Sequence, residues 1–180
     1  AGGANCMLVS LKEGKVTTLP GVVTIADGTA VKTPGEKIFP YIQKYLDDII
    51  TVKDEDLIVA FLDMVENHKM IVENSGLLTA AAVKDLKVKN KKVVCILSGG
   101  NMDVITMSSI VQNGLIQRDR IFTISVLLPD KPGELVRVSQ VTAKEQGNVI
   151  RLDHNQFVST NRNAAVELKI TLEAFQRNLK

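Results

Sequence analysis

Apolar residues in the first part of the chain recur mostly at helical spacing, three or four positions apart. This spacing predicts a short helix over residues 36–46 and a second helix after Asp54, whose side chain we expect to cap it. The second helix has the clearest apolar stripe, which runs over residues 57–65. Residues 75–86 are alanine-rich and predict a third helix, and a fourth is expected at about 103–113.

Two short apolar runs between these helices are typical of buried strands. Residues 48–52 are rich in β-branched side chains, and residues 92–97 form an apolar run of the kind that a sheet covers on both faces. Cys95 lies within the second run, so we expect it to be buried. Strands that alternate with helices favour an α/β fold with an open, mostly parallel sheet.

The pattern changes after the polar stretch 117–120, where we place a domain boundary between residues 118 and 119. Beyond it, apolar and polar residues alternate in short segments, which predicts strands, and in 165–173 the alternation predicts one buried and one exposed face. The expected elements are a strand (122–128), a break at 129–133, a helix ended by a left-handed Gly147, a strand (148–154), a turn (159–163) and a strand (165–173). The order β-α-β-β predicts a small α+β module.

Charge and composition narrow the range of partners. The 22 Lys and Arg residues nearly balance the 20 Asp and Glu residues, so we expect neither nucleic acid nor a membrane surface as the main partner. No apolar run approaches the roughly 20 residues of a membrane helix, and no leader-like segment precedes Ala1, so a cytoplasmic protein is expected. Cys6 and Cys95 lack metal-ligand spacing, and no metal site is predicted.

The residues most suggestive of chemistry follow the apolar run 92–97. Ser98, Gly99, Gly100 and Asn101 form a glycine-rich turn between an expected strand and an expected helix. In open α/β sheets such turns approach a ring or an anion closely, and the start of the next helix offers free N–H groups. A tight turn without a ligand needs the same glycines, so this motif alone leaves both interpretations open.

Four segments, in the same order and spacing, resemble the threonine ammonia-lyases and serine racemases, which are fold-type II pyridoxal-phosphate enzymes. The segments are TIADGTAVKTPG (24–35), YLDDI (45–49), MIVENSG (70–76) and LSGGNMD (97–103). The resemblance covers nearly the whole chain. It implies that residues 1–118 are the C-terminal half of a catalytic domain that uses pyridoxal 5'-phosphate. The implied activity is the conversion of L-threonine to 2-oxobutanoate and ammonia, in threonine catabolism or isoleucine biosynthesis.

The resemblance also implies roles for single residues. Ser98 matches the serine whose hydroxyl hydrogen-bonds the pyridine nitrogen of the cofactor. A neutral hydroxyl leaves that nitrogen mostly unprotonated, which makes the ring a milder electron sink. Gly99 and Gly100 match the turn beneath the ring, while Gly28 and Glu73 match residues that line the cofactor pocket.

The resemblance also bears on three features outside the cofactor pocket: an activating nucleotide, a metal ion and the catalytic residues. Lys69 and Asn101 match residues that contact an activating nucleotide in some relatives, although the residues alone would suggest that Lys69 and Glu73 are merely exposed charges. An aspartate of the metal site found in some relatives aligns with Cys6, which argues against a metal here. The family's cofactor-anchoring lysine, substrate loop and phosphate cradle lie upstream of anything matching Ala1. We therefore expect no catalytic residue in this chain and no activity from it alone.

Residues 119–180 resemble an ACT domain, a ferredoxin-like module that pairs side by side and binds an amino acid. The segment LLPDKPGEL (127–135) matches its first strand-to-helix loop. The resemblance implies allosteric control by an amino acid bound at this loop, and a homo-oligomer. The residues implied are Asp130, Gly133, Glu134 and Leu135. The ACT pattern βαββαβ has a further helix and strand, so the module is incomplete here, and a plain turn before a helix is the alternative.

Two other functions stay open at this point. A serine dehydratase or serine racemase belongs to the same family, and steady-state rates with L-threonine, L-serine and D-serine separate these activities. The chain is alternatively a complete, non-catalytic, ACT-type amino-acid sensor. The coding sequence upstream of Ala1 distinguishes the sensor from the enzyme, because only the enzyme needs a lysine-bearing N-terminal half.

Overall fold

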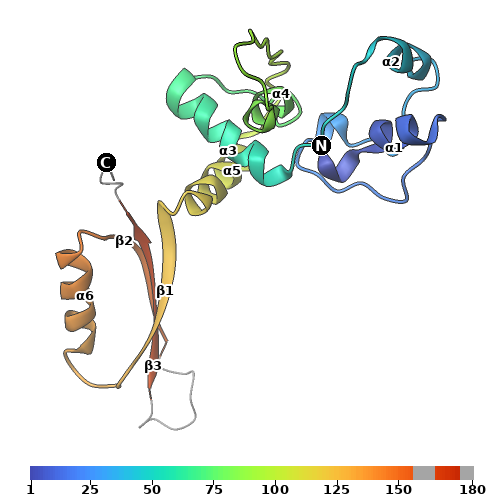
Figure 1. Cartoon of the computed structure of the whole chain (residues 1–180). Helices are drawn as coiled ribbons and strands as arrows, with labels where there is room; N and C mark the ends of the chain where they lie inside the picture. Colours follow the sequence, from blue (N-terminus) through green and yellow to red (C-terminus); the bar gives the residue numbers. More distant parts are fainter. Residues whose placement is uncertain (156–164, 175–180) are drawn as a thin grey trace. The chain divides into compact units, whose positions relative to one another are not determined.

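A computed structural model describes residues 1–155 and 165–174 of the chain and divides it into two compact units, Ala1–Gly114 and Leu115–Lys180 (Figure 1). This division falls inside a helix, slightly before the boundary predicted at residues 118 and 119. The assignment of the two parts to a catalytic and a regulatory domain stays a prediction. In the described residues, no helix has the length and apolar character needed to cross a bilayer.

Helices and irregular segments make up the first unit. The helical elements are η1 (Gly2–Ala4), α1 (Cys6–Glu13), η2 (Asp27–Thr29), α2 (Phe39–Tyr45), α3 (Asp54–Asp63), η3 (Met64–His68), α4 (Leu78–Ala82), η4 (Val83–Asp85) and α5 (Val104–Gln117). Helices α2 to α5 confirm the four helices predicted from the sequence, and Pro40 lies in the first turn of α2, where its missing N–H is tolerated. A single turn of π-helix, η3, continues α3.

The stripe predicted on the second helix forms the centre of the first unit's core. Leu57 and Phe61 of α3 are fully buried, as is Leu77 at the start of α4, and Ile110 of α5 packs into the same cluster. Helix α3 therefore holds α4 and α5 together through apolar contact, which is the main source of stability for a helix of this length.

The expected capping role of Asp54 is wrong. Lys53 occupies the N-cap position of α3 without a side-chain cap bond, and Asp54 is the first helical residue. Its carboxylate instead accepts hydrogen bonds from Thr24 and Ile25, about thirty residues earlier in the chain. A tertiary partner has replaced the local one that the sequence pattern suggested.

The predicted parallel sheet is absent from the described residues of the first unit, because neither 48–52 nor 92–97 forms a strand. Val94 is 89% exposed, Ile96 is 72% exposed, and Cys95 is only partly buried. A strand needs a neighbour to satisfy its N–H and C=O groups. The run 92–97 instead has contacts with Thr79, whose hydroxyl donates to the Ile96 carbonyl at 2.8 Å.

A three-stranded antiparallel sheet with one helix makes up the described part of the second unit. Its elements are β1 (Ile121–Leu128), α6 (Glu134–Lys144), β2 (Asn148–Asn155) and β3 (Val166–Glu173). The strand order is β1-β3-β2, and Figure 1 shows α6 along one face of the sheet. These elements confirm the predicted strands and helix, whereas the predicted turn at 159–163 lies outside the described residues.

The central strand β3 has the alternation that its sequence predicts. Val166, Leu168, Ile170 and Leu172 are all buried, and Val138 of α6 packs against them. In the register, Ile170 faces Ile124 of β1 and Leu152 of β2. The apolar face of β3 is therefore the core of this unit.

The residue that ends α6 differs from the prediction. Gln146, not Gly147, has the left-handed conformation, with φ at 59°. A Cβ added at Gly147 would lie 3.1 Å from Thr142 Cγ2, a tighter approach than most side chains tolerate. Glycine at 147 is thus explained by close packing against the end of α6.

We predict that Ile170→Ala lowers the free energy of unfolding by about 2–5 kcal/mol, because it leaves a cavity in the core of the second unit. Lys169→Ala, on the exposed face of the same strand, should change it by less than about 0.5 kcal/mol. Denaturant unfolding followed by far-UV circular dichroism measures both variants. Equal effects of the two substitutions would contradict the assignment of faces.

Candidate functional site

The turn at 98–101 packs directly against Glu73. The Glu73 N–H donates to the Gly99 carbonyl at 3.3 Å, and Glu73 Oε2 accepts a hydrogen bond from the Asn101 N–H at 3.1 Å. Gly99 has φ at +81°, and a Cβ added there would overlap the Glu73 carboxyl group. Glycine at position 99 is therefore required both by its backbone conformation and by the space that Glu73 occupies.

Gly28 approaches the same carboxylate from the turn η2. A Cβ added at Gly28 would lie 2.8 Å from Ser75 Oγ and 3.8 Å from Glu73 Oε1. The Ser75 hydroxyl oxygen is buried and has no hydrogen-bond partner in the described structure. Three of the predicted cofactor-binding residues, Gly28, Glu73 and Gly99, thus meet at one point, which we call the Glu73 cluster.

Ser98 lies at the edge of the Glu73 cluster with its side chain exposed. Its carbonyl packs against Gly76, where an added Cβ would overlap the carbonyl oxygen. No hydrogen bond of the Ser98 hydroxyl occurs within residues 1–155 and 165–174. The hydroxyl is therefore free to donate to, or accept from, a bound group.

Gly100, unlike Gly99, has neither a positive φ nor a close neighbour that excludes a side chain. Its φ is not positive, and a Cβ there would have the Ile71 carbonyl oxygen as its nearest neighbour at 3.8 Å, an ordinary contact. The protein's own geometry gives Gly100 no requirement for glycine, and the role beneath the cofactor ring that the resemblance implies for it stays a prediction.

A cavity of about 460 Å³ opens beside the Glu73 cluster. Its walls include the carboxylates of Asp27, Glu73 and Asp103, and its lining contains no lysine, arginine or histidine. Hydrogen bonding by the Thr106 side chain, together with the Thr106 N–H that donates to Asp103 Oδ1 at 2.8 Å, holds the pKa of Asp103 below its ordinary value. Of the five predicted cofactor residues, Glu73 alone lines this cavity, and Asn101, a predicted nucleotide contact, lines it as well.

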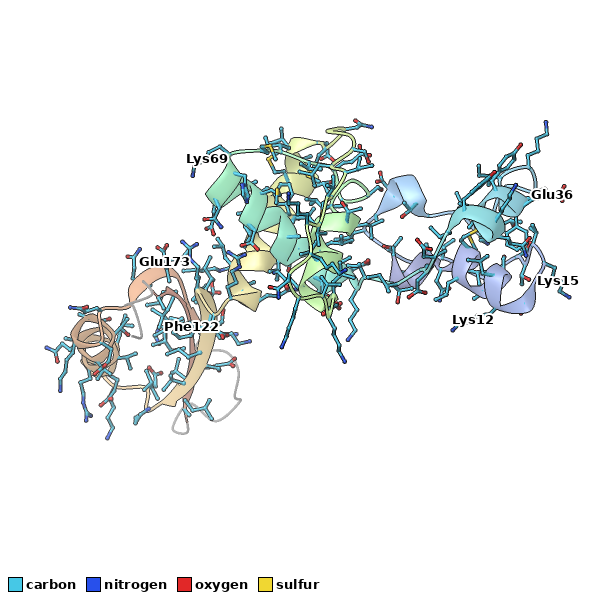
Figure 2. All side chains as sticks on the ribbon, turned by 45° about the horizontal axis from the view of Figure 1, so that its top comes forward. Lys12, Lys15, Glu36, Lys69, Phe122 and Glu173 are labelled. Atoms are coloured by element: carbon cyan, nitrogen blue, oxygen red, sulfur yellow. The ribbon has the colours of Figure 1, made fainter. Side chains whose placement is uncertain are left out.

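The structure does not bring the two predicted nucleotide contacts together. Lys69 follows η3 in a left-handed conformation, donates its Nζ proton to the Glu66 carbonyl at 2.5 Å, and projects from the ribbon in Figure 2. Asn101 uses its N–H for Glu73. The cavity of about 460 Å³ is lined by Asn101 but not by Lys69.

The predicted effector loop does surround a single cavity, of about 320 Å³, in the second unit. Asp130, Gly133, Glu134 and Leu135 all line it. Gly133 has φ at +94° and forms the N-cap of α6. The sequence prediction missed Lys131 and His154, which line the same cavity and come from the loop and from β2.

Several other contacts of the site were also missed. Asn74 Nδ2 donates to the Ile25 carbonyl at 2.9 Å, and Asp54 holds the Thr24 hydroxyl and the Ile25 N–H. Asn74 lies within the quoted motif 70–76 and Asp54 lies outside all four motifs, and nothing local in the sequence indicates the partners of either side chain. No three His, Cys, Asp or Glu side chains in the described residues are arranged to hold a metal ion.

Residues 1–99 match the protein family described as "Pyridoxal-phosphate dependent enzyme". The chain belongs to this family. The match includes Gly28, Glu73, Ser98 and Gly99, and so covers the Glu73 cluster. It ends before the second unit, whose likeness to an ACT domain stays a prediction.

The chain is similar to two bacterial members of this pyridoxal-phosphate family. The chain is 36% identical to an L-threonine ammonia-lyase of Geobacter sulfurreducens over 91% of its length, and 36% identical to one of Thermotoga maritima over 83%. It covers only 41% and 38% of these two proteins. The chain therefore spans about two fifths of the length of these curated relatives.

Solved structures of the family are also similar to the chain. Threonine deaminase isoform 2 of Solanum lycopersicum is 34% identical, with a TM-score of 0.57, over 61% of this chain and 31% of that one. Maize serine racemase is 32% identical, with a TM-score of 0.53, over 62% and 37%.

We predict that Gly99→Ala disrupts the Glu73 cluster of this pyridoxal-phosphate family member, because the new methyl group must displace the Glu73 carboxylate and the backbone must hold a positive φ. The expected cost is about 1–3 kcal/mol in the free energy of unfolding of the first unit. Gly100→Ala is the matched control and should have little effect, since its methyl group meets only an ordinary contact. Denaturant titration compares the two, and equal losses would refute the role of Gly99.

Proposed function

We propose that this chain forms one side of the cofactor pocket of a pyridoxal-phosphate-dependent threonine ammonia-lyase, which converts L-threonine into 2-oxobutanoate and ammonia. The convergence of Gly28, Glu73 and Gly99 beside the exposed Ser98 supports this proposal most strongly. The substrate is taken from the bacterial relatives, both described as L-threonine ammonia-lyase.

The residues of the Glu73 cluster fit the pyridine end of this cofactor. Bound pyridoxal phosphate supplies an electron-withdrawing ring that stabilises negative charge at the α-carbon of the substrate. Ser98 would hold the ring nitrogen through its free, neutral hydroxyl, while Gly28 and Gly99 leave the space that side chains would otherwise fill. The cluster's only charge is the Glu73 carboxylate, so the cofactor phosphate needs donors from elsewhere in the full-length protein.

Glu73 fixes the turn that presents Ser98. Its Oε2 accepts the Asn101 N–H, and its own N–H donates to the Gly99 carbonyl, so Glu73 binds the turn on both sides of Gly100. A rigid turn restricts the position of the Ser98 hydroxyl before the cofactor arrives, which lowers the entropy lost on binding. Glu73 is therefore assigned to shaping the pocket floor, not to proton transfer.

The second unit is assigned to control by an amino acid. The cavity at the start of α6 combines Lys131 with the helix N-terminus, and both attract a carboxylate group. Asp130 and Glu134 line the same cavity and suit the ammonium group of an amino acid. A homo-oligomer in the cytoplasm, without nucleic-acid or membrane partners, completes the proposal.

Serine racemase is the second candidate activity, because the maize serine racemase structure is similar to this chain. The two candidates use the same cofactor, but ammonia-lyase activity breaks the Cβ–O bond of the substrate, whereas racemisation breaks and re-forms only the Cα–H bond. We expect the complete polypeptide in which this chain occurs to form 2-oxobutanoate from L-threonine faster than it consumes L-serine or D-serine. Steady-state rates with the three amino acids decide, and interconversion of the serine enantiomers without threonine turnover would favour the racemase.

We predict that Ser98→Ala in the complete polypeptide weakens pyridoxal-phosphate binding about fivefold, the equivalent of one hydrogen bond of about 1 kcal/mol. Ser108→Ala, an exposed serine on α5, serves as the control and should leave the affinity unchanged. Titration of the apoprotein by cofactor absorbance measures both dissociation constants. Equal affinities of wild type and Ser98→Ala would remove Ser98 from the site.

A further inference from the structure

We infer that Asp54 is the positioning residue for the Gly28 side of the proposed cofactor pocket, and this inference rests on the proposed function. Asp54 belongs to α3 and does not touch Gly28, Glu73 or Ser98 itself. It acts through residues 24–26, which precede the turn that carries Gly28. Local sequence gives it a different role, that of a helix cap, which the structure shows it does not have.

The Asp54 carboxylate binds this segment with both oxygens. The Thr24 hydroxyl donates to Oδ1 at 2.6 Å, and the Ile25 N–H donates to Oδ2 at 2.9 Å. The Thr24 oxygen in turn accepts the Ala26 N–H at 3.2 Å. Hydrogen bonds to a charged carboxylate are stronger than those between neutral groups, so this pair fixes the backbone at residues 24–26.

Asn74, which lies between η3 and α4, also binds the segment 24–26. Its Nδ2 donates to the Ile25 carbonyl at 2.9 Å, so side chains from two parts of the chain bind both main-chain groups of Ile25. Asn74 is only 5% exposed and directly follows Glu73. The segment 24–26 is therefore tied to α3 on one side and to the Glu73 cluster on the other.

The hydrogen bonds to residues 24–26 also restrict the position of Gly28, which follows them closely in the chain. Ala26 is fully buried, and the 3-10 turn η2 begins at the next residue, so Gly28 has little freedom once residues 24–26 are fixed. Gly28 then lies against Ser75 and Glu73 with no room for a side chain. Loss of the two hydrogen bonds to Asp54 allows η2 to move away from Glu73, which widens the floor of the proposed pocket.

Asp54 shares the start of its helix with two other acidic residues. Asp54 is the first residue of α3, where the free N–H groups of the helix start stabilise a negative charge. Glu55 and Asp56 lie in the same first turn, but of these three acidic side chains only Asp54 hydrogen-bonds residues 24–26. Glu55 is exposed and therefore provides a control that removes a charge from the same helix start.

Three variants separate the hydrogen bonds of Asp54 from its charge. Asp54→Ala removes both bonds. Asp54→Asn keeps both in a rearranged form, because the amide oxygen accepts the Ile25 N–H and the amide NH₂ donates to the Thr24 oxygen. Thr24→Val removes one bond to the carboxylate and the neutral bond from the Ala26 N–H, and leaves the Ile25 N–H bond to Asp54 intact. A positioning role therefore predicts that the Asn variant is close to wild type and that the Ala variant is the most affected.

The first measurement is amide hydrogen exchange in the 180-residue chain without cofactor. We expect exchange at residues 25–29 to be faster in Asp54→Ala by about tenfold or more, as for the loss of two charge-assisted hydrogen bonds. Thr24→Val should give a smaller increase, while Asp54→Asn and Glu55→Ala should match wild type. Exchange in β1 and β3 serves as an internal standard. Unchanged exchange at 25–29 in Asp54→Ala overturns the inference, whatever the function of the protein.

The second measurement is the dissociation constant of pyridoxal phosphate in the complete polypeptide. Asp54→Ala should raise it by about tenfold, with recovery in Asp54→Asn and no change in Glu55→Ala. A general loss of stability would lower the unfolding midpoint without this pattern of recovery, and that outcome contradicts a positioning role. If the wild-type polypeptide itself binds no pyridoxal phosphate, the proposed function fails, while the exchange data still decide whether Asp54 fixes residues 24–29.

Discussion

The close contact between the Glu73 carboxylate and two glycines is the constraint on which the candidate site depends. Gly28 and Gly99 come from segments about seventy residues apart, and each leaves the volume of a side chain to its neighbours. Because the carboxylate also binds the Asn101 N–H, the turn at 98–101 has one position relative to η2. The exposed Ser98 hydroxyl is placed as a consequence of this packing and not by any partner of its own.

Elements that depend on local periodicity could be predicted from the sequence, and those that depend on a distant neighbour could not. The alternation of β3 and the stripe of α3 were correct because each residue's burial follows from its position in the repeat. Residues 92–97 have the composition of a buried strand, yet a strand exists only when another strand accepts and donates its hydrogen bonds. In the described residues of the first unit no such partner is present.

The same distinction applies to the candidate site. The family resemblance identified Gly28, Glu73 and Gly99, but no local pattern reveals that these three residues meet. Asp54 shows the limit most clearly, since an aspartate before an apolar stripe has the signature of a cap and here binds residues thirty positions away. Glycine at 147 was likewise assigned to backbone freedom, whereas the structure explains it by packing.

Exposed apolar side chains lie next to the candidate site in the first unit and affect how a cofactor would bind there. Val94 and Ile96 lie in the apolar run just before Ser98 and are largely exposed, as is Ile105 at the start of α5. Apolar side chains gain free energy when they leave water, so any polypeptide that covers this run also covers the Ser98 hydroxyl. A hydrogen bond to a ring nitrogen is stronger once water is excluded from its surroundings. Under the proposed function, burial of the run 92–97 and binding of the cofactor are therefore coupled, and each stabilises the other.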